Sequence, residues 1–206
     1  YGEGILIPDE TIHVTIPDTV DDVVRNYAER VLADYQFEYD FEDTDGTKLL
    51  LGTAGDGSAA DTYFADVDYD RETSVDIDEG YVLAVDAEQN TIAVLGHDSS
   101  GIFNGLSTLR WMLESSRAQL KEAVITDAPD TLYRGIVEGF YGEYSFEERM
   151  DLIEFIGPLK MNTYIYGSKS DPYHNGQWRE TYAQDKIRQI AQLVECGKAN
   201  NVELVW

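Results

Sequence analysis

A repeated strand and helix pattern in the second half of the chain decides its fold, and residues 134–166 read RGIVEGFYGEYSFEERMDLIEFIGPLKMNTYIY. Two β-rich runs, residues 134–137 and 161–166, flank a segment with helical spacing. Ser145 and Glu148 form a capping box at the start of this helix, and Gly157-Pro158 ends it. A second helix over residues 185–199 and a strand over residues 202–206 follow. Alternating strands and helices predict parallel pairing through right-handed crossovers.

The number of strands limits how much of a barrel this pattern can supply. A (β/α)8 TIM barrel needs eight parallel strands, whereas residues 131–206 predict three strands and two helices. The sequence also stops within the last predicted strand. These strands are therefore too few to close such a barrel, and the chain looks cut rather than naturally finished.

Residues 1–130 combine strand and helix signals in a different order. Gly80–Asp86 and Thr91–Leu95 predict a hairpin across the turn Ala87–Asn90. Asp98 or Ser99 can cap the helix that follows. Further strands are expected over residues 11–16, 48–51 and 122–126, and a further helix over residues 18–35. This region therefore predicts an α+β accessory domain.

The acidic residues and the single cysteine of the sequence do not form a recognisable metal-binding motif. One acidic stretch lacks the fixed spacing and the terminal bidentate glutamate of an EF-hand, so we favour a solvated acidic loop over a calcium site; it contains Glu38, Asp40, Glu42, Asp43 and Asp45. The single cysteine, Cys196, can form neither an internal disulfide nor a Cys-rich metal site. We expect no metal site and no organic cofactor.

The net charge restricts the classes of partner. The 206 residues carry 15 Lys and Arg against 40 Asp and Glu, a formal charge of −25. Residues 1–133 hold 7 basic and 29 acidic residues, a net charge of −22, and the rest of the chain accounts for −3. This change of composition near residue 130 marks a candidate domain boundary. Phosphate backbones and anionic lipids repel such a molecule, so we expect no nucleic-acid partner and no membrane insertion.

Two segments at predicted strand ends carry the candidate chemistry, because functional groups of parallel α/β units collect there. Residues 138–142 place two glycines around two aromatic side chains, which suits the stacking face and the hydroxyls of a sugar. A tight turn with core aromatics is the alternative. In the second segment, residues 167–174, Lys169 and Asp171 can address neighbouring hydroxyls as donor and acceptor. A solvated surface charge is the alternative for Lys169. We interpret His174 as structural, since no second histidine lies at a metal-ligand spacing.

The same segments resemble the start of the catalytic barrel of glycoside hydrolase family 84, the β-N-acetylglucosaminidases that include the O-GlcNAcases and the bacterial enzymes named hyaluronidases. The resemblance lies in residues 134–142, in residues 160–166, in the Lys169-x-Asp171-Pro172-Tyr173-His174 motif and in Trp178-Arg179-Glu180. Residues 1–130 resemble, more loosely, the α+β domain that precedes the barrel, of the kind called family 20 domain 2. The resemblance implies that residues 131–206 form the first β/α units of a (β/α)8 TIM barrel, truncated after about the third strand.

The resemblance implies specific site residues. By similarity, Gly139 through its backbone and Lys169 contact the hydroxyls of a terminal N-acetylglucosamine, and Tyr141 shapes the sugar pocket. Catalysis in the family is retaining and substrate-assisted, with the acetamido oxygen as nucleophile and two adjacent aspartates as helpers. Those aspartates follow the fourth barrel strand, so no catalytic residue is assigned here and the chain is expected to be inactive. Asp21 and Asp22 are also adjacent, but they lie at the start of a predicted helix. We interpret them as stabilising the helix dipole and not as catalytic residues.

Two departures from the family pattern affect the pocket rim. Glu143-Tyr144 stands where the family commonly has Pro-Trp, and Gly167-Ser168-Lys169-Ser170-Asp171 stands where it commonly has Ala-Pro-Lys-Asp-Asp. The expected partner is a β-N-acetylglucosaminyl glycan or glycoprotein, uncharged or protein-linked rather than hyaluronan. A non-catalytic carbohydrate-binding or scaffold module is the alternative. The resemblance further implies a secreted or cell-surface bacterial protein, and the open barrel edge suggests self-association.

Overall fold

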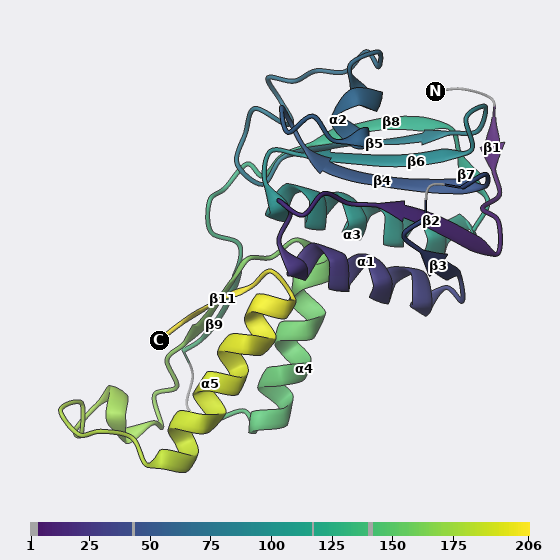
Figure 1. The fold of residues 1–206 in the computed structure, drawn as a ribbon. Coiled ribbons are helices and arrows are strands. Elements are labelled where there is room, and N and C mark those ends of the chain that lie inside the picture. Colours follow the sequence, from purple (N-terminus) through teal and green to yellow (C-terminus); the bar gives the residue numbers. More distant parts are fainter. Residues whose placement is uncertain (1–3, 43, 117, 140–141) are drawn as a thin grey trace. The chain divides into compact units, whose positions relative to one another are not determined.

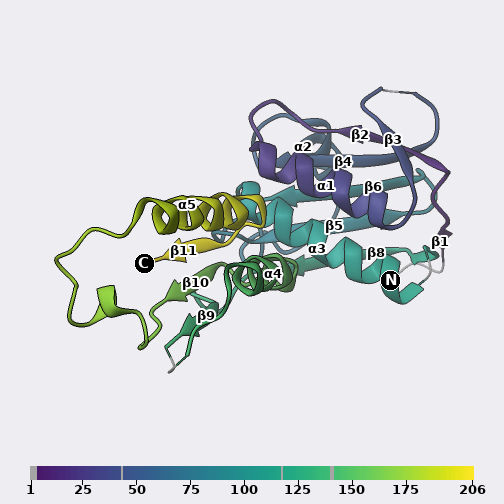
Figure 2. The same cartoon turned by 90° about the horizontal axis from the view of Figure 1, so that it is seen from below.

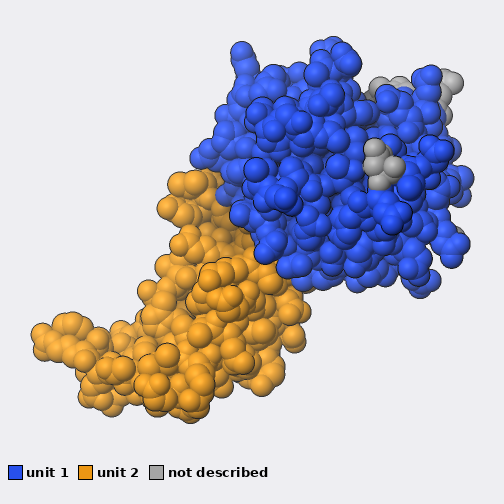
Figure 3. Space-filling model, in the orientation of Figure 1, with its two compact units in different colours: residues 1–130 blue, residues 131–206 orange. Residues whose placement is uncertain are grey.

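The computed structural model describes residues 4–42, 44–116, 118–139 and 142–206. The chain divides into two compact units, residues 1–130 and residues 131–206 (Figure 3). None of the helices in these described ranges combines the length and the apolar character that a membrane span requires.

Unit 1 is built on a six-stranded mixed sheet with the strand order β3-β2-β4-β6-β5-β8. Strand β2 pairs in parallel with β3 and β4, and β4 pairs in parallel with β6. Strand β5 runs antiparallel to both β6 and β8. The elements of the unit are β1 (Ile5–Leu6), β2 (Thr11–Thr15), α1 (Asp22–Asp34), β3 (Glu38–Asp40), β4 (Thr47–Thr53), α2 (Ala59–Phe64), β5 (Tyr81–Asp86), β6 (Thr91–Gly96), α3 (Ser99–Ser116), β7 (Leu120–Lys121) and β8 (Ala123–Asp127).

Helices cover both faces of this sheet. Figures 1 and 2 show α1 and α3 against one face and α2 against the other. Successive side chains of a strand point to opposite faces. Leu49 and Leu51 of β4 accordingly pack in the core with α1 and α3, whereas Leu50 packs with Phe64 of α2. The predicted α+β class and the predicted hairpin of β5 and β6 are confirmed.

The expectation of a solvated loop in the acidic segment is wrong for part of its length. Glu38–Asp40 forms strand β3 at the edge of the sheet, in parallel with β2. A carboxylate oxygen of Asp40 lies 2.7 Å from Nδ1 of His13, and this hydrogen bond raises the pKa of the imidazole. The two residues are 27 positions apart in the chain, so a local sequence pattern contains no signal of their pairing.

Unit 2 is a three-stranded parallel sheet with the order β11-β10-β9, as the alternating pattern predicts. Ser145 and Glu148 form the predicted capping box: the Ser145 N–H donates to Glu148 Oε2 (2.7 Å), and the Glu148 N–H donates to Ser145 Oγ (3.1 Å). The elements are β9 (Gly135–Glu138), α4 (Phe146–Ile156), the 3-10 helix Gly157–Leu159, β10 (Thr163–Tyr166), the 3-10 helix Pro172–His174, α5 (Gln184–Ala199) and β11 (Glu203–Val205).

The two faces of this small sheet differ. One face packs on α4 and α5 through a core that includes Ile153, Tyr164 and Leu193. Val137, Ile165 and Val205 project from the three strands at aligned positions, and all three are exposed. The sheet of unit 2 therefore has one covered face and one uncovered apolar row.

Candidate active site

Two loops leave the same edge of the unit 2 sheet. Glu138, at the end of β9, lies opposite Tyr166, at the end of β10, in the parallel ladder. Because the carboxyl ends of parallel strands meet at one edge, the segments after these residues start at the same level. We call residues 139–142 the first loop and residues 167–171 the second loop.

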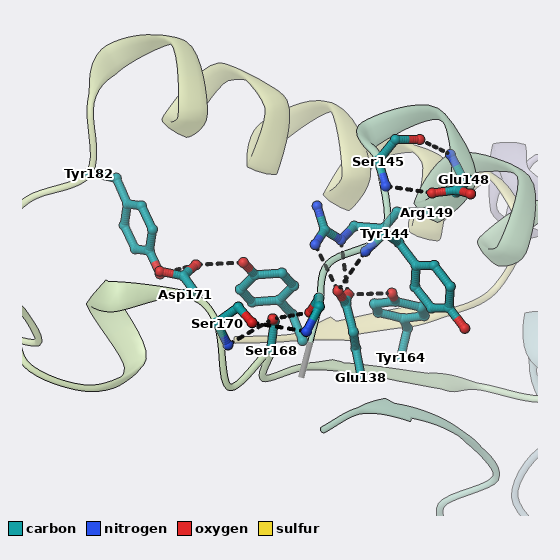
Figure 4. A network of polar contacts seen from close by, with 12 residues as sticks. Glu138, Tyr144, Ser145, Glu148, Arg149, Tyr164, Ser168, Ser170, Asp171 and Tyr182 are labelled. Carbon is teal, nitrogen blue, oxygen red and sulfur yellow. Dashed lines mark hydrogen bonds and ion pairs between the residues drawn. The ribbon is translucent and has the colours of Figure 1, made fainter. Parts of the chain in front are cut away.

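Glu138, the last residue of β9, forms a buried ion pair with Arg149. Glu138 accepts two hydrogen bonds from the Arg149 guanidinium of α4, at 2.9 Å from Nε and 2.7 Å from Nη2. The Tyr164 hydroxyl donates to the same carboxylate at 2.8 Å, and the Tyr144 N–H donates at 3.3 Å. Figure 4 shows Glu138 between Arg149 and Tyr164. The Glu138 side chain has no exposed surface and the Arg149 side chain is 4% exposed, so this pair anchors the start of the first loop on the helix.

The charges in this cluster are matched. Burial by itself raises the pKa of Glu138, but the hydrogen bonds from Arg149 and Tyr164 and the positive charge of Arg149 outweigh it and lower the pKa. Burial and the neighbouring carboxylate raise the pKa of Tyr164. Glu138 is therefore an ionised structural acceptor, and a bidentate pair of this kind is unsuited to donating a proton to a substrate.

A second buried carboxylate holds the second loop. The Tyr166 hydroxyl donates to Asp171 Oδ2 at 2.5 Å, and the Tyr182 hydroxyl donates to the same atom at 3.2 Å. The Tyr173 N–H donates to the other oxygen at 2.9 Å. Only 2% of Asp171 is exposed. These hydrogen bonds outweigh the effect of burial and lower the pKa of Asp171.

This arrangement corrects one interpretation made from the sequence. We expected Asp171 to accept a hydrogen bond from a substrate hydroxyl beside Lys169. Both carboxylate oxygens instead bind groups of the protein, two tyrosine hydroxyls and a backbone N–H. The two-residue spacing could not show this, because Tyr166 and Tyr182 approach Asp171 only through the turn of the folded loop.

The two loops are hydrogen-bonded to each other. The Ser168 hydroxyl donates to the Gly142 carbonyl oxygen at 2.7 Å, and the Gly142 N–H donates to Ser170 Oγ at 2.9 Å. In Figure 4 these contacts lie between Asp171 and Glu138. The geometry brings the first and second loops together at the carboxyl ends of β9 and β10.

The predicted sugar-contacting residues belong to these loops. Gly139 and Lys169 are both exposed. Among the described residues, a Cβ built on Gly139 would meet only Val137 Cγ1, at an ordinary 3.5 Å, so this part of the fold leaves room for a side chain there. Tyr141 lies outside the described residues. His174 packs its ring edge-on to Tyr166, with 5.2 Å between centroids.

Metal ligands are absent from the part of the chain that the structure describes. No group of three or more His, Cys, Asp or Glu side chains there is arranged to hold a metal ion. The polar atoms of the two loops can recognise uncharged hydroxyl and amide groups through a lysine ammonium and exposed backbone.

Comparisons with known proteins agree with this geometry. Residues 134–206 match the family model described as beta-N-acetylglucosaminidase, and residues 5–128 match that of glycosyl hydrolase family 20, domain 2. The chain belongs to glycoside hydrolase family 84. Its N-terminal domain is of the family 20 domain 2 type, and the start of the catalytic domain follows.

Individual family members support the assignment over different lengths. The solved structure of CpGH84D matches all of this chain with a TM-score of 0.90 and 30% identity, and that of CpGH84B matches 98% with a TM-score of 0.84 and 29% identity. The Protein O-GlcNAcase of Rattus norvegicus is 33% identical over 73 residues, which are 35% of this chain. The chain spans 35% of CpGH84D and 8% of the rat protein.

A buried polar cluster of unit 2 was not predicted from the sequence. It consists of Glu138, Arg149 and Tyr164, which hold the start of the first loop. One signal was available: a charged residue at the end of an apolar strand and an arginine on the helix that follows are both at positions expected to be buried.

Proposed function

We propose that this chain is the N-terminal part of a retaining, substrate-assisted β-N-acetylglucosaminidase that hydrolyses terminal β-linked N-acetylglucosamine from glycoproteins or glycans. The observation that carries the proposal is the hydrogen-bonded pairing of the two loops. It joins the exposed segments of Gly139 and Lys169 at the carboxyl ends of two parallel strands. Family 84 membership supports the reaction class.

The uncovered face of the unit 2 sheet supports a larger barrel. Val137, Ile165 and Val205 are 60%, 37% and 36% exposed and lie in register on neighbouring strands. Branched apolar residues in such rows fill the interior of (β/α)8 barrels. We propose that further β/α units cover this row in the full-length enzyme and complete a TIM barrel.

Substrate recognition is assigned to three residues. The Gly139 backbone and the Lys169 ammonium bind the sugar hydroxyls, and Tyr141 shapes the pocket. Because an added Cβ at Gly139 meets no obstacle among the residues that the structure describes, Gly139→Ala tests the site with little effect on the fold. We expect this variant of the full-length enzyme to lose at least tenfold in kcat/KM while its melting temperature stays within about 2 °C of the wild type. Unchanged kinetics would remove Gly139 from the site.

The adjacent aspartates that orient the acetamide and act as general acid and base are proposed to lie outside these 206 residues. We expect the isolated chain to show no turnover of an aryl β-N-acetylglucosaminide and the full-length protein to hydrolyse it with retention at the anomeric carbon. Appreciable turnover by the isolated chain would contradict the first expectation. A full-length protein that binds N-acetylglucosamine without turnover would favour the non-catalytic binding module.

Neutral or protein-linked glycans are the proposed substrates. Residues 1–133 carry a net charge of −22, which slows the approach of the polyanion hyaluronan at low salt. We expect the full-length enzyme to process a neutral glycoside faster than a hyaluronan oligosaccharide. The difference between the two rates should decrease as added salt shortens the electrostatic screening length from about 30 Å at about 0.01 M to about 8 Å at about 0.15 M. The opposite ranking would contradict this preference.

The proposed location is secreted or at a bacterial cell surface. It rests on the family resemblance alone and is tested by fractionating cells that express the full-length gene and assaying glucosaminidase activity in the medium and at the surface. Activity confined to the cell interior would contradict it.

A further inference from the structure

Two serines on either side of Lys169 bind one glycine of the other loop. Ser168 donates to the carbonyl oxygen of Gly142 and Ser170 accepts from its N–H, at 2.7 and 2.9 Å. Both polar backbone groups of Gly142 are therefore satisfied by the immediate neighbours of the lysine. This two-bond contact is a link between the loops beyond the pairing of β9 with β10.

The contact is held firmly on the Lys169 side. Ser168 is completely buried, and its Oγ also accepts from the Ser170 N–H at 3.2 Å. The carbonyl oxygen of Lys169 accepts from Asn175 Nδ2 at 2.9 Å. The backbone on both sides of the lysine is thereby fixed, which limits the ammonium to positions that its own side-chain rotamers reach.

The contact also constrains the first loop. Gly142 has a φ of +104°, in the left-handed region that side chains disfavour. Its two hydrogen bonds hold it in this conformation three residues after Gly139. The serines therefore hold Gly142, at the end of the first loop, beside the segment that carries Lys169.

We propose that Ser168 and Ser170 are positioning residues that hold Lys169 at the sugar site by binding Gly142 from both sides. The proposal rests on the proposed function, since it describes how the sugar-contacting groups of that site are held. In this proposal the serines act on substrate through Lys169, since the Ser168 hydroxyl donates to Gly142 and the Ser170 hydroxyl accepts from it.

The test uses steady-state kinetics of the full-length enzyme on an aryl β-N-acetylglucosaminide. We expect Ser168→Ala and Ser170→Ala each to lower kcat/KM about tenfold, equal to about 1.4 kcal/mol. Ser170→Thr keeps the acceptor oxygen at an exposed position and is expected to restore wild-type kinetics. Ser115→Ala, at an exposed serine of α3 in unit 1, is the matched control and should leave the kinetics unchanged.

A double-mutant cycle separates positioning from a structural role. If the serines act through Lys169, Ser170→Ala costs nothing further in a Lys169→Ala background. Additive losses, or wild-type kinetics in Ser170→Ala, would overturn the proposal while leaving the proposed function intact. Ser168 is buried, so Ser168→Ala can lower the melting temperature. In that case the kinetics of Ser170→Ala and Ser170→Thr, at an exposed position, decide whether the serines position Lys169. A wild-type enzyme that neither binds nor hydrolyses the glycoside would overturn both proposals together.

Discussion

Glu138 and Arg149 show how a single residue pair can determine the shape of a loop. The buried carboxylate accepts two hydrogen bonds from Arg149, one from Tyr164 and one from the Tyr144 N–H, which together fill its capacity. Because Tyr144 comes after the first loop, this last bond also ties the far end of the loop back to its start. The residue-scale consequence is a rigid frame for the exposed Gly139.

Removing one partner of this pair should destabilise unit 2 strongly. Glu138→Gln leaves the Arg149 charge buried without its counter-ion, so we expect a loss of about 3–5 kcal/mol in the free energy of unfolding, measured by urea titration. The control Glu154→Gln, at an exposed position of α4, the helix that carries Arg149, should change the free energy of unfolding by less than about 0.5 kcal/mol. A Glu138→Gln/Arg149→Met double variant should be less destabilised than Glu138→Gln. A loss below 1 kcal/mol in Glu138→Gln would contradict the buried geometry.

Two carboxylates predict the acid sensitivity of unit 2. The pKa values of Glu138 and Asp171 are lowered in the folded state. A carboxylate with a lowered pKa stabilises the fold above its ordinary value of about 4, and this contribution is lost as pH falls through the folded value. We expect the free energy of unfolding to decrease from about pH 5 downward, and Asp171→Asn to reduce that slope.

The matched control for acid sensitivity is Asp151→Asn on the exposed face of α4. It should retain the wild-type slope in urea titrations between pH 5 and pH 3. Equal slopes for Asp171→Asn and Asp151→Asn would show that Asp171 contributes nothing to the acid transition.

At the scale of elements, close approach of backbones explains features that helix propensity does not. Gly101 lies in the first turn of α3, and a Cβ there would sit 2.2 Å from the carbonyl oxygen of Gly80. The glycine therefore allows the helix to approach the segment that leads into β5. A propensity argument by itself would predict the reverse, since alanine is the better helix former.

The effect of Gly101→Ala on the stability of unit 1 distinguishes helix propensity from close backbone approach, because the two predict changes of opposite sign. Propensity predicts a gain of up to about 1 kcal/mol, whereas the clash with Gly80 predicts a loss of about 1–3 kcal/mol in the stability of unit 1. We expect the loss, measured as a lower urea midpoint. Gly176→Ala is the control, because a Cβ there meets nothing within 4 Å. A more stable Gly101→Ala variant would refute the close approach.

Strong local signals predicted most elements. The capping box of Ser145 and Glu148, the β5–β6 hairpin and the strand periodicity of unit 2 all depend on residues within a few positions of one another. Strand β3 and helix α2 were missed because their short sequences carry no periodicity of their own. Strand β3 gains its order from pairing with β2 and from the His13–Asp40 contact.

For the whole molecule, the uncovered row of Val137, Ile165 and Val205 and the outer edge of β11 have the largest consequence. Within the described residues β11 pairs only with β10, so its other edge presents unpaired backbone groups. We expect the isolated 206-residue chain to self-associate with increasing concentration in sedimentation velocity runs. Val205→Lys should shift it toward the monomer, and a strictly monomeric wild type would contradict the expectation.

The sequence alone determined the class of each region. Its periodicities are local, and they predicted an α+β domain followed by parallel β/α units, while the −25 charge argued against nucleic acid and the strand-end motifs resembled family 84. The tertiary structure decided which polar residues are available. Asp171 and Glu138 point inward, where they bind tyrosines and an arginine. The two loops are linked by the hydrogen bonds of Ser168 and Ser170 to Gly142. These contacts link residues on different elements, so only the packed chain brings them within hydrogen-bond distance.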